Sequence, residues 1–159
     1  MDLVATPSIT LAILCRHVQR GRIDLMPWSR EHRVQLQEVD AANVVFFGTY
    51  FTIAHQAYEL ALLENGFDLA PLLAAGQQAL PMVHAEADYQ SPLRYGDTAT
   101  VTVTCGRIGE RSFTLDYTLT KGGAPVARLR HIHACLDVAA KRSTALPVAL
   151  VAALQKLVP

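Results

Sequence analysis

The segment TYFTIAHQAYELALLEN, residues 49–65, has the pattern of a long helix with apolar residues on nearly all sides. Thr49 is of a residue type that caps helix N-termini, and Asn65-Gly66 supplies a C-terminal stop. The apolar positions of the predicted helix are Tyr50, Phe51, Ile53, Ala54, Ala57, Leu60, Ala61, Leu62 and Leu63. A helix with so wide an apolar surface is buried. In one small domain, the simplest cover for it is a curved sheet.

Strand patterns lie on both sides of this helix. Residues 31–39 alternate apolar Val34 and Leu36 with polar neighbours, which is the period of a strand. Similar patterns follow the helix, and the further predicted strands are residues 81–89, 97–108, 111–120 and 125–138. A short last helix is predicted over residues 147–157, with Pro147 in its first turn.

Glycine-containing turns join the late strands. Gly109-Glu110 and Lys121-Gly122-Gly123 separate alternating segments, as in β-hairpins. Hairpins make neighbouring strands antiparallel, so the sequence predicts one antiparallel sheet of about five strands that covers one long helix. This α+β arrangement resembles the hotdog fold, in which a sheet curls around a central helix.

Length and charge narrow the class of protein. The chain has 159 residues, with 14 Lys+Arg against 14 Asp+Glu, and 51% of its residues are hydrophobic. This predicts a single domain, residues 29–159, preceded by a short amphipathic extension, residues 1–28. The balanced charge lacks the excess of basic residues that is typical of nucleic-acid-binding domains. Because only 18% of the residues are charged, we expect part of the surface to be covered by further copies of the chain.

Cysteine usage and apolar runs bear on location. Cys15, Cys105 and Cys135 are widely spaced and form no CxxC pair, which favours a reducing, cytoplasmic compartment. No apolar run reaches the roughly 18 residues that span a membrane. The short apolar stretch Ile9–Cys15 lacks the flanks of a signal peptide, and Met26 is a possible alternative start.

Asp40 is the residue that points most directly to chemistry. It ends a predicted strand and is followed by an apolar loop, residues 41–47. Aspartate is common in turns because its carboxylate bonds nearby backbone amides, and this interpretation stays open. The helix that follows would offer free N–H groups that polarise a carbonyl oxygen. A carboxylate beside such a carbonyl attacks it or activates a water, and a thioester is a suitable target.

Three blocks of the sequence carry a family resemblance: residues 34–60, 81–97 and 135–150. Together they resemble the 4-hydroxybenzoyl-CoA thioesterase family of hotdog enzymes. Within it, HQAYE at residues 55–59 and PMVHA at residues 81–85 look most like the branch that hydrolyses 1,4-dihydroxy-2-naphthoyl-CoA in quinone biosynthesis. The resemblance implies a thioesterase for an aromatic acyl-CoA that needs no metal or other cofactor. It also implies a homodimer or homotetramer with active sites at the protomer interface.

The resemblance assigns roles residue by residue. Asp40 takes the place of the family's catalytic carboxylate, which is a nucleophile or a general base. The backbone N–H of Phe47 takes the place of the group that binds the thioester oxygen. The remaining positions are expected to bind substrate: Tyr50, His55 and His84 near the acyl group, and Arg111 at the phosphates of coenzyme A. Asn43 departs from the glycine that is common in the family, but asparagine tolerates left-handed backbone, so the loop is expected to keep its shape.

Several alternatives accompany this assignment. Glu59 is an alternative second carboxylate, although a position at a subunit contact or at the helix edge explains it better. His131 and His133 share one strand face and are interpreted as structural rather than as metal ligands. The alternatives for coenzyme A are Arg107, Arg128 and Arg130. The alternative functions are a short-chain acyl-CoA or acyl-carrier-protein thioesterase, and an acyl-binding module without catalysis.

Overall fold

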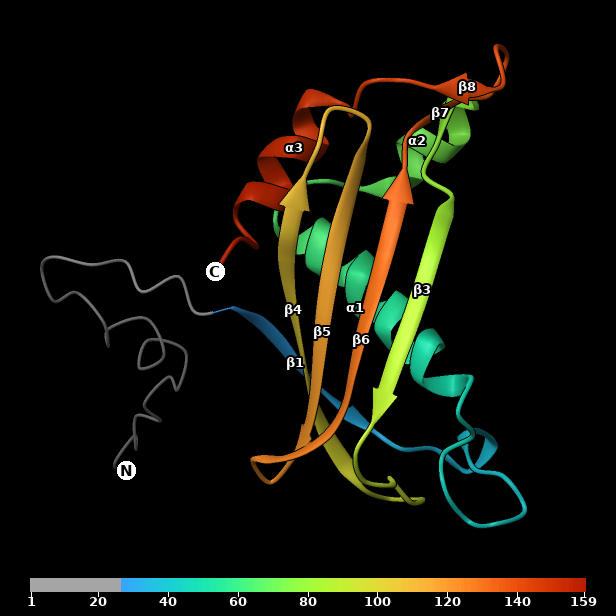
Figure 1. Cartoon of the computed structure of the whole chain (residues 1–159), viewed down its shortest axis with the longest axis vertical. Helices are drawn as coiled ribbons and strands as arrows, with labels where there is room; N and C mark the ends of the chain where they lie inside the picture. The colour runs from blue at the N-terminus through green and yellow to red at the C-terminus, as the bar shows by residue number, and fades with distance from the viewer. Residues whose placement is uncertain (1–26) are drawn as a thin grey trace, which may run out of the picture.

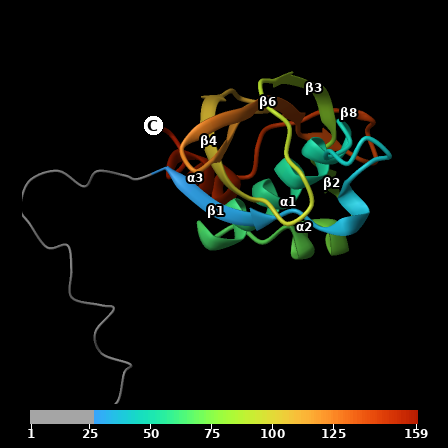
Figure 2. The same cartoon turned by 90° about the horizontal axis from the view of Figure 1, so that it is seen from below.

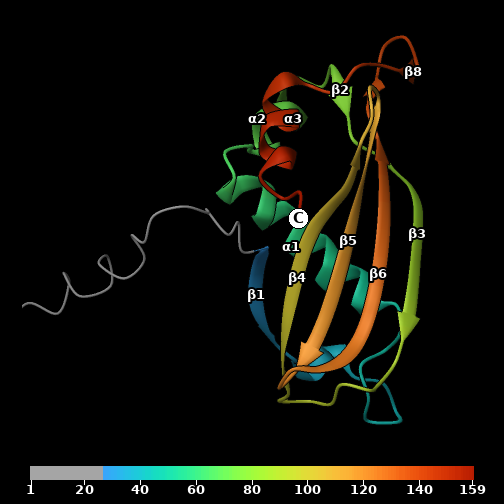
Figure 3. The same ribbon diagram turned by 60° about the vertical axis from the view of Figure 1, so that its left-hand side comes forward.

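The computed structural model of the protein describes residues 27–159 (Figure 1). A five-stranded antiparallel sheet has the strand order β1-β4-β5-β6-β3. Its strands are β1 (Trp28–Arg33), β3 (Met82–Tyr89), β4 (Thr98–Ile108), β5 (Ser112–Lys121) and β6 (Ala124–Ala134). The sheet curves around the long helix α1 (Thr49–Glu64), as Figures 2 and 3 show. The predicted architecture of one antiparallel sheet around one long helix is confirmed.

The register between the central strands places the core. Val101 pairs with Leu119, and Val103 pairs with Tyr117. All four side chains are buried, whereas the threonines between them on β4 face the other side of the sheet and are half-buried. The alternation of apolar and polar residues in this part of the sequence therefore matches the alternation of buried and less buried side chains along the strands.

Helix α1 contributes the other half of this core. Its buried residues are Tyr50, Ile53, Ala54, Ala57, Tyr58, Ala61 and Leu62. Leu63 is 53% exposed, so the helix packs with one broad face rather than all round. Gly48, and not Thr49, occupies the N-cap position, and no side chain caps this end. No side chain therefore satisfies the N–H groups of the first turn, and those of Thr49 and Phe51 donate to the carbonyls of Phe46 and Gly48.

The first strand lies earlier in the chain than predicted. β1 ends at Arg33, which pairs with Thr98, the first residue of β4. Val34 is still bonded to Asp97 and Gly96 in the turn before β4, and β4 extends no further along residues 35–39. The chain turns instead into a short 3₁₀ helix, Leu36–Glu38. Val34 is buried but Leu36 is 69% exposed, so the predicted strand over residues 31–39 is wrong in its second half.

Small elements complete the fold. The predicted strand 125–138 is interrupted after Ala134, and β7 (Leu136–Asp137) joins β2 (Gln78–Ala79) and β8 (Arg142–Ser143) in a second sheet. Two helices flank the core: α2 (Leu69–Ala75), which was not predicted, and α3 (Val148–Gln155), inside the predicted range.

The described region begins just before β1. Residues 1–26, most of the predicted extension, lie outside the described residues. Trp28 already belongs to β1, and its indole N–H donates to Glu64 at the end of α1 over 2.6 Å. Within residues 27–159, no helix is both long and apolar enough to cross a membrane.

Candidate active site

Asp40 lies in a tight turn before α1. Its backbone N–H donates to the carbonyl of Val44 over 2.9 Å, and its carboxylate accepts the N–H of Ala42 over 2.8 Å. Asn43 has a left-handed φ of 59°, so the asparagine keeps the loop conformation that was expected. The carboxylate therefore makes the bond typical of a turn, and it has further acceptor sites that this bond does not use.

The loop is held by the connection between β3 and β4. The N–H of Val45 donates to the carbonyl of Leu93 over 2.8 Å, and Arg94 donates to the carbonyl of Asn43 over 3.2 Å. Asp40 itself is exposed. Within one chain, the apolar residues that follow Asp40 in sequence therefore do not bury its carboxylate.

Backbone donors at the start of α1, those of Phe47 and Gly48 among them, have no partner in the part of the chain that the structure describes. Within residues 27–159, neither the N–H of Phe47 nor that of Gly48 makes a backbone or side-chain hydrogen bond. The next amide is occupied, because the N–H of Thr49 donates to the carbonyl of Phe46 over 2.9 Å. Free N–H groups at a helix N-terminus suit a carbonyl oxygen that gains negative charge.

An apolar hollow of about 270 Å³ adjoins this loop. Its wall includes Val44, Phe47, Tyr50 and Tyr89. The Tyr50 ring meets the Tyr89 ring edge-on, with centroids 5.2 Å apart, and its hydroxyl accepts the N–H of Leu93 over 3.3 Å. Burial raises the pKa of Tyr50, which keeps its phenol neutral. The hollow is thus a neutral, aromatic-walled space next to the two free donors.

Tyr89 is a residue of this site that the sequence analysis missed. Its hydroxyl donates to the carbonyl of Phe47 over 2.9 Å. The only signal in the sequence was its place as the last residue of a predicted strand, which says nothing about its partner.

Three predicted substrate-binding residues lie away from Asp40 within one chain. The turn between β4 and β5 lies at the far end of the sheet from the loop before α1 (Figure 1). Arg111 belongs to this turn, with its Nε 3.5 Å from Glu110. His84 lies on β3, 3.2 Å from Glu86. His55 lies on α1 and is 3.3 Å from Glu59. Within one chain, Phe47 and Tyr50 line one hollow, and Asp40 lies in the loop that reaches this hollow through Val44. Arg111, His84 and His55 do not line it.

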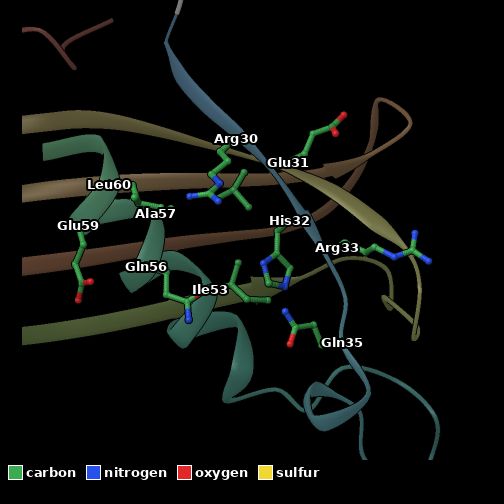
Figure 4. A pocket seen from close by; sticks show the side chains of 11 residues that line it. Arg30, Glu31, His32, Arg33, Gln35, Ile53, Gln56, Ala57, Glu59 and Leu60 are labelled. Atoms are coloured by element: carbon green, nitrogen blue, oxygen red, sulfur yellow. The ribbon is translucent and has the colours of Figure 1, made fainter. Parts of the chain in front are cut away.

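A larger groove, of about 470 Å³, lies between β1 and α1 (Figure 4). Its lining includes Arg30, His32, Gln56 and Glu59, the possible second carboxylate. The loop that contains Asp40 and Phe47 contributes no residue to this groove, whereas Val44 and Phe47 of that loop line the smaller hollow. Its greater size therefore does not make it the better candidate for acyl transfer.

His131 and His133 are buried between the sheet and α1, at 0% and 1% exposure. Their ring centroids are 6.2 Å apart, and the His55 ring is 6.2 Å from that of His133. In the part of the chain that the structure describes, no three His, Cys, Asp or Glu side chains are grouped to hold a metal ion.

Comparison with known proteins finds relatives of this chain. Residues 34–154 match the family described as the thioesterase-like superfamily. The 1,4-dihydroxy-2-naphthoyl-CoA hydrolase of Synechococcus elongatus is 36% identical over 115 residues, which are 72% of this chain and 85% of that protein. The hydrolase of the same name from Nostoc punctiforme is 30% identical over 122 residues, 77% of this chain and 82% of that one.

Solved structures show the same fold. The crystal structure of a 1,4-dihydroxy-2-naphthoyl-CoA thioesterase from Synechocystis superimposes with a TM-score of 0.79 at 28% identity. That match covers 83% of this chain and 98% of the other. A Staphylococcus aureus protein in complex with CoA gives a TM-score of 0.78 at 20% identity, covering 88% and 90% of the two chains, and bears on the fold alone.

Proposed function

This chain belongs to the thioesterase-like superfamily and is a hotdog-fold thioesterase, and from this premise we propose that its substrate is 1,4-dihydroxy-2-naphthoyl-CoA. The observation that carries the proposal is the juxtaposition of the Asp40 loop, the free N–H groups of Phe47 and Gly48, and the aromatic hollow. The product acid would serve quinone biosynthesis. We place the reaction in the cytoplasm, since Cys105 and Cys135 are free thiols.

The chemistry follows from these groups. The thioester oxygen accepts a hydrogen bond from the N–H of Phe47, which stabilises the negative charge that develops on it. The carboxylate of Asp40 either attacks the carbonyl carbon or takes a proton from an attacking water. The carbon–sulfur bond breaks, and coenzyme A leaves as a thiolate that is then protonated. In the nucleophilic route, water hydrolyses the resulting anhydride and restores Asp40.

The walls of the hollow support an aromatic acyl group. Phe47, Tyr50 and Tyr89 contribute three rings. Flat aromatic groups gain energy from edge-to-face and offset contacts with such rings, beyond simple burial. Phe47 is 62% exposed and Tyr89 46% exposed in the single chain, so both have surface left for a ligand.

A second copy of the chain would complete the site. β3 is an edge strand of the main sheet, and Met82 and Val83 on it are exposed apolar residues. Unpaired edges of this kind are templates for a further strand. We infer that two copies join along β3, antiparallel to each other, as a dimer or as half of a tetramer.

Antiparallel joining would gather the scattered residues. The register Met82↔His133 and Ser112↔Ala134 puts the turn that carries Arg111 at the Met82 end of β3, whereas Tyr89 and the Asp40 loop are at its other end. In an antiparallel pair these opposite ends come together. Arg111 and His84 of the partner subunit would then approach the loop of the first copy, as the predicted interface site requires.

Hydrolysis of acyl-CoA thioesters, followed with a thiol reagent, tests the proposal. We expect turnover of 1,4-dihydroxy-2-naphthoyl-CoA to exceed that of benzoyl-CoA and of short aliphatic thioesters. Asp40→Asn should lower kcat by at least about 100-fold, because it removes the acid–base or nucleophilic group. The asparagine keeps an oxygen that can accept the N–H of Ala42, so the turn should survive.

Glu59→Gln is the matched control, since it removes a carboxylate from α1 outside the hollow. We expect it to retain hydrolysis. Loss of activity in Glu59→Gln with normal turnover by Asp40→Asn would reverse the assignment of the catalytic carboxylate. Turnover confined to short aliphatic thioesters would exclude the naphthoyl substrate.

A further inference from the structure

We propose that Tyr89 is a positioning residue for thioester hydrolysis, holding the Phe47 carbonyl so that the free N–H of Gly48, in the same peptide group, keeps a fixed direction beside the N–H of Phe47. The inference rests on the proposed function. Tyr89 ends β3, and its hydroxyl reaches across to the loop before the helix, 42 residues away in sequence, to donate over 2.9 Å.

The donor is well suited to this role. Burial raises the pKa of Tyr89, so its hydroxyl keeps its proton at neutral pH. Its ring is braced edge-on by the ring of Tyr50, which is 3% exposed and whose hydroxyl in turn accepts the N–H of Leu93. The two tyrosines therefore link the end of β3, the β3–β4 connection and the start of α1.

The hydrogen bond acts on the backbone of Phe47 from its C-terminal side. The peptide group between Phe47 and Gly48 is planar, with its carbonyl and its N–H pointing in opposite directions. A carbonyl held by Tyr89 therefore aims the N–H of Gly48 away from Tyr89. On the N-terminal side, the preceding peptide is held because the Phe46 carbonyl accepts the N–H of Thr49 over 2.9 Å.

Phe47 is therefore fixed at both of its peptide groups, although its own side chain is 62% exposed and gives it little packing. Removal of the Tyr89 hydroxyl would release one of these two peptides and let the carbonyl turn toward water. The N–H of Gly48 would then sample several directions, whereas that of Phe47 stays held through the Phe46 carbonyl. Preorganised donors act on charge that develops in the transition state, so disorder of the Gly48 N–H, the second free donor, lowers kcat more than it weakens substrate binding.

Tyr89→Phe tests this, because it removes the hydroxyl and keeps the ring. We expect kcat for the preferred acyl-CoA to fall about tenfold, less than the loss of a whole oxyanion donor, with KM changed by less than about twofold. The same substitution at Tyr95, which is 60% exposed, is the control and should leave both constants unchanged. An unchanged kcat in Tyr89→Phe would overturn the inference, and so would a higher KM at constant kcat, the mark of a plain substrate contact.

A second readout does not depend on activity. Phe47-Gly48 is the only Phe-Gly step in the sequence, so labelling with carbonyl-¹³C phenylalanine and ¹⁵N glycine gives one correlated NMR signal from this peptide group. We expect the carbonyl ¹³C signal to move to lower chemical shift in Tyr89→Phe and to stay in place in Tyr95→Phe. A signal that stays in place in both variants would overturn the inference alone, whereas failure of the wild-type chain to hydrolyse any thioester would overturn the proposed function.

Discussion

Asn43 has the left-handed backbone conformation on which the Asp40 turn depends. Its φ is 59°, and its carbonyl accepts a bond from Arg94 over 3.2 Å. Asparagine and glycine adopt this conformation readily, whereas residues such as alanine meet a steric penalty of about 1–2 kcal/mol. Asn43→Ala should therefore lower the free energy of unfolding by about 1 kcal/mol, which denaturant titration measures, and it should also lower kcat by displacing Asp40.

Asn43→Gly separates the backbone from the side chain at this position. The change keeps the left-handed conformation, so we expect kcat close to that of the wild-type chain. Equal kcat in the alanine and glycine variants would show that the backbone conformation of Asn43 does not control the position of Asp40.

The layer between β6 and α1 contains buried histidines. His131 is 0% exposed, and neither of its ring nitrogens has a hydrogen-bond partner within the described residues. Phe51 of α1 stacks on the ring at 5.9 Å, and Tyr117 of β5 lies at 4.7 Å. Burial first, then the neighbouring His133 and His55, lower the pKa of His131 from 6.5 to about 4. Between pH 4 and pH 6.5, His131 is therefore mostly neutral in the folded chain and mostly protonated in the unfolded chain.

This predicts a loss of stability in acid. Between pH 6.5 and pH 4 the unfolded chain binds a proton at His131 that the folded chain does not, so the free energy of unfolding falls as the pH falls through this window. At pH 5 the titration of His131 makes the free energy of unfolding about 2 kcal/mol lower than at pH 8. His131→Phe keeps an aromatic ring and removes the titration, so denaturant unfolding should show a flatter pH dependence. The same dependence in variant and wild type would place the acid sensitivity elsewhere.

Helices and strands were predictable from the sequence where the spacing of apolar residues matches the side that is buried along the whole element. The alternation over β4 and β5 matches their burial because both strands lie in the middle of the sheet. At β1 the same kind of alternation continued past Arg33, but backbone pairing ended with Val34 at the turn before β4. Helix α2 has a capping Asp68 and a left-handed Gly76 at its ends, yet it is too short for helical periodicity to reveal.

The candidate site was predictable in its parts and not in its arrangement. Asp40, Phe47 and Tyr50 follow one another in a single loop and helix, so sequence proximity already places them together. Arg111 belongs to a turn whose distance from Asp40 depends on strand order, and Tyr89 acts through a bond that spans 42 residues. Both facts depend on the topology of the sheet, which local patterns do not contain.

At the scale of the whole molecule, the free edge of β3 connects assembly to activity. Val83 on this strand is 60% exposed, and Val148 on α3 is 86% exposed. Val83→Lys puts a charge on the edge along which two copies are proposed to join, where charged side chains oppose further pairing. We expect this variant to shift from a dimer or tetramer toward the monomer in light scattering, and to lose hydrolysis in parallel.

Val148→Lys makes the same chemical change on a different surface and should keep both the mass and the activity of the wild-type chain. Because Arg111 and His84 are separated from Asp40 within one chain, activity should also depend on protein concentration in Val83→Lys and recover as copies associate. A Val83→Lys monomer with full activity at low concentration would show that one chain holds the complete site, and the role proposed for the partner subunit would fall with it.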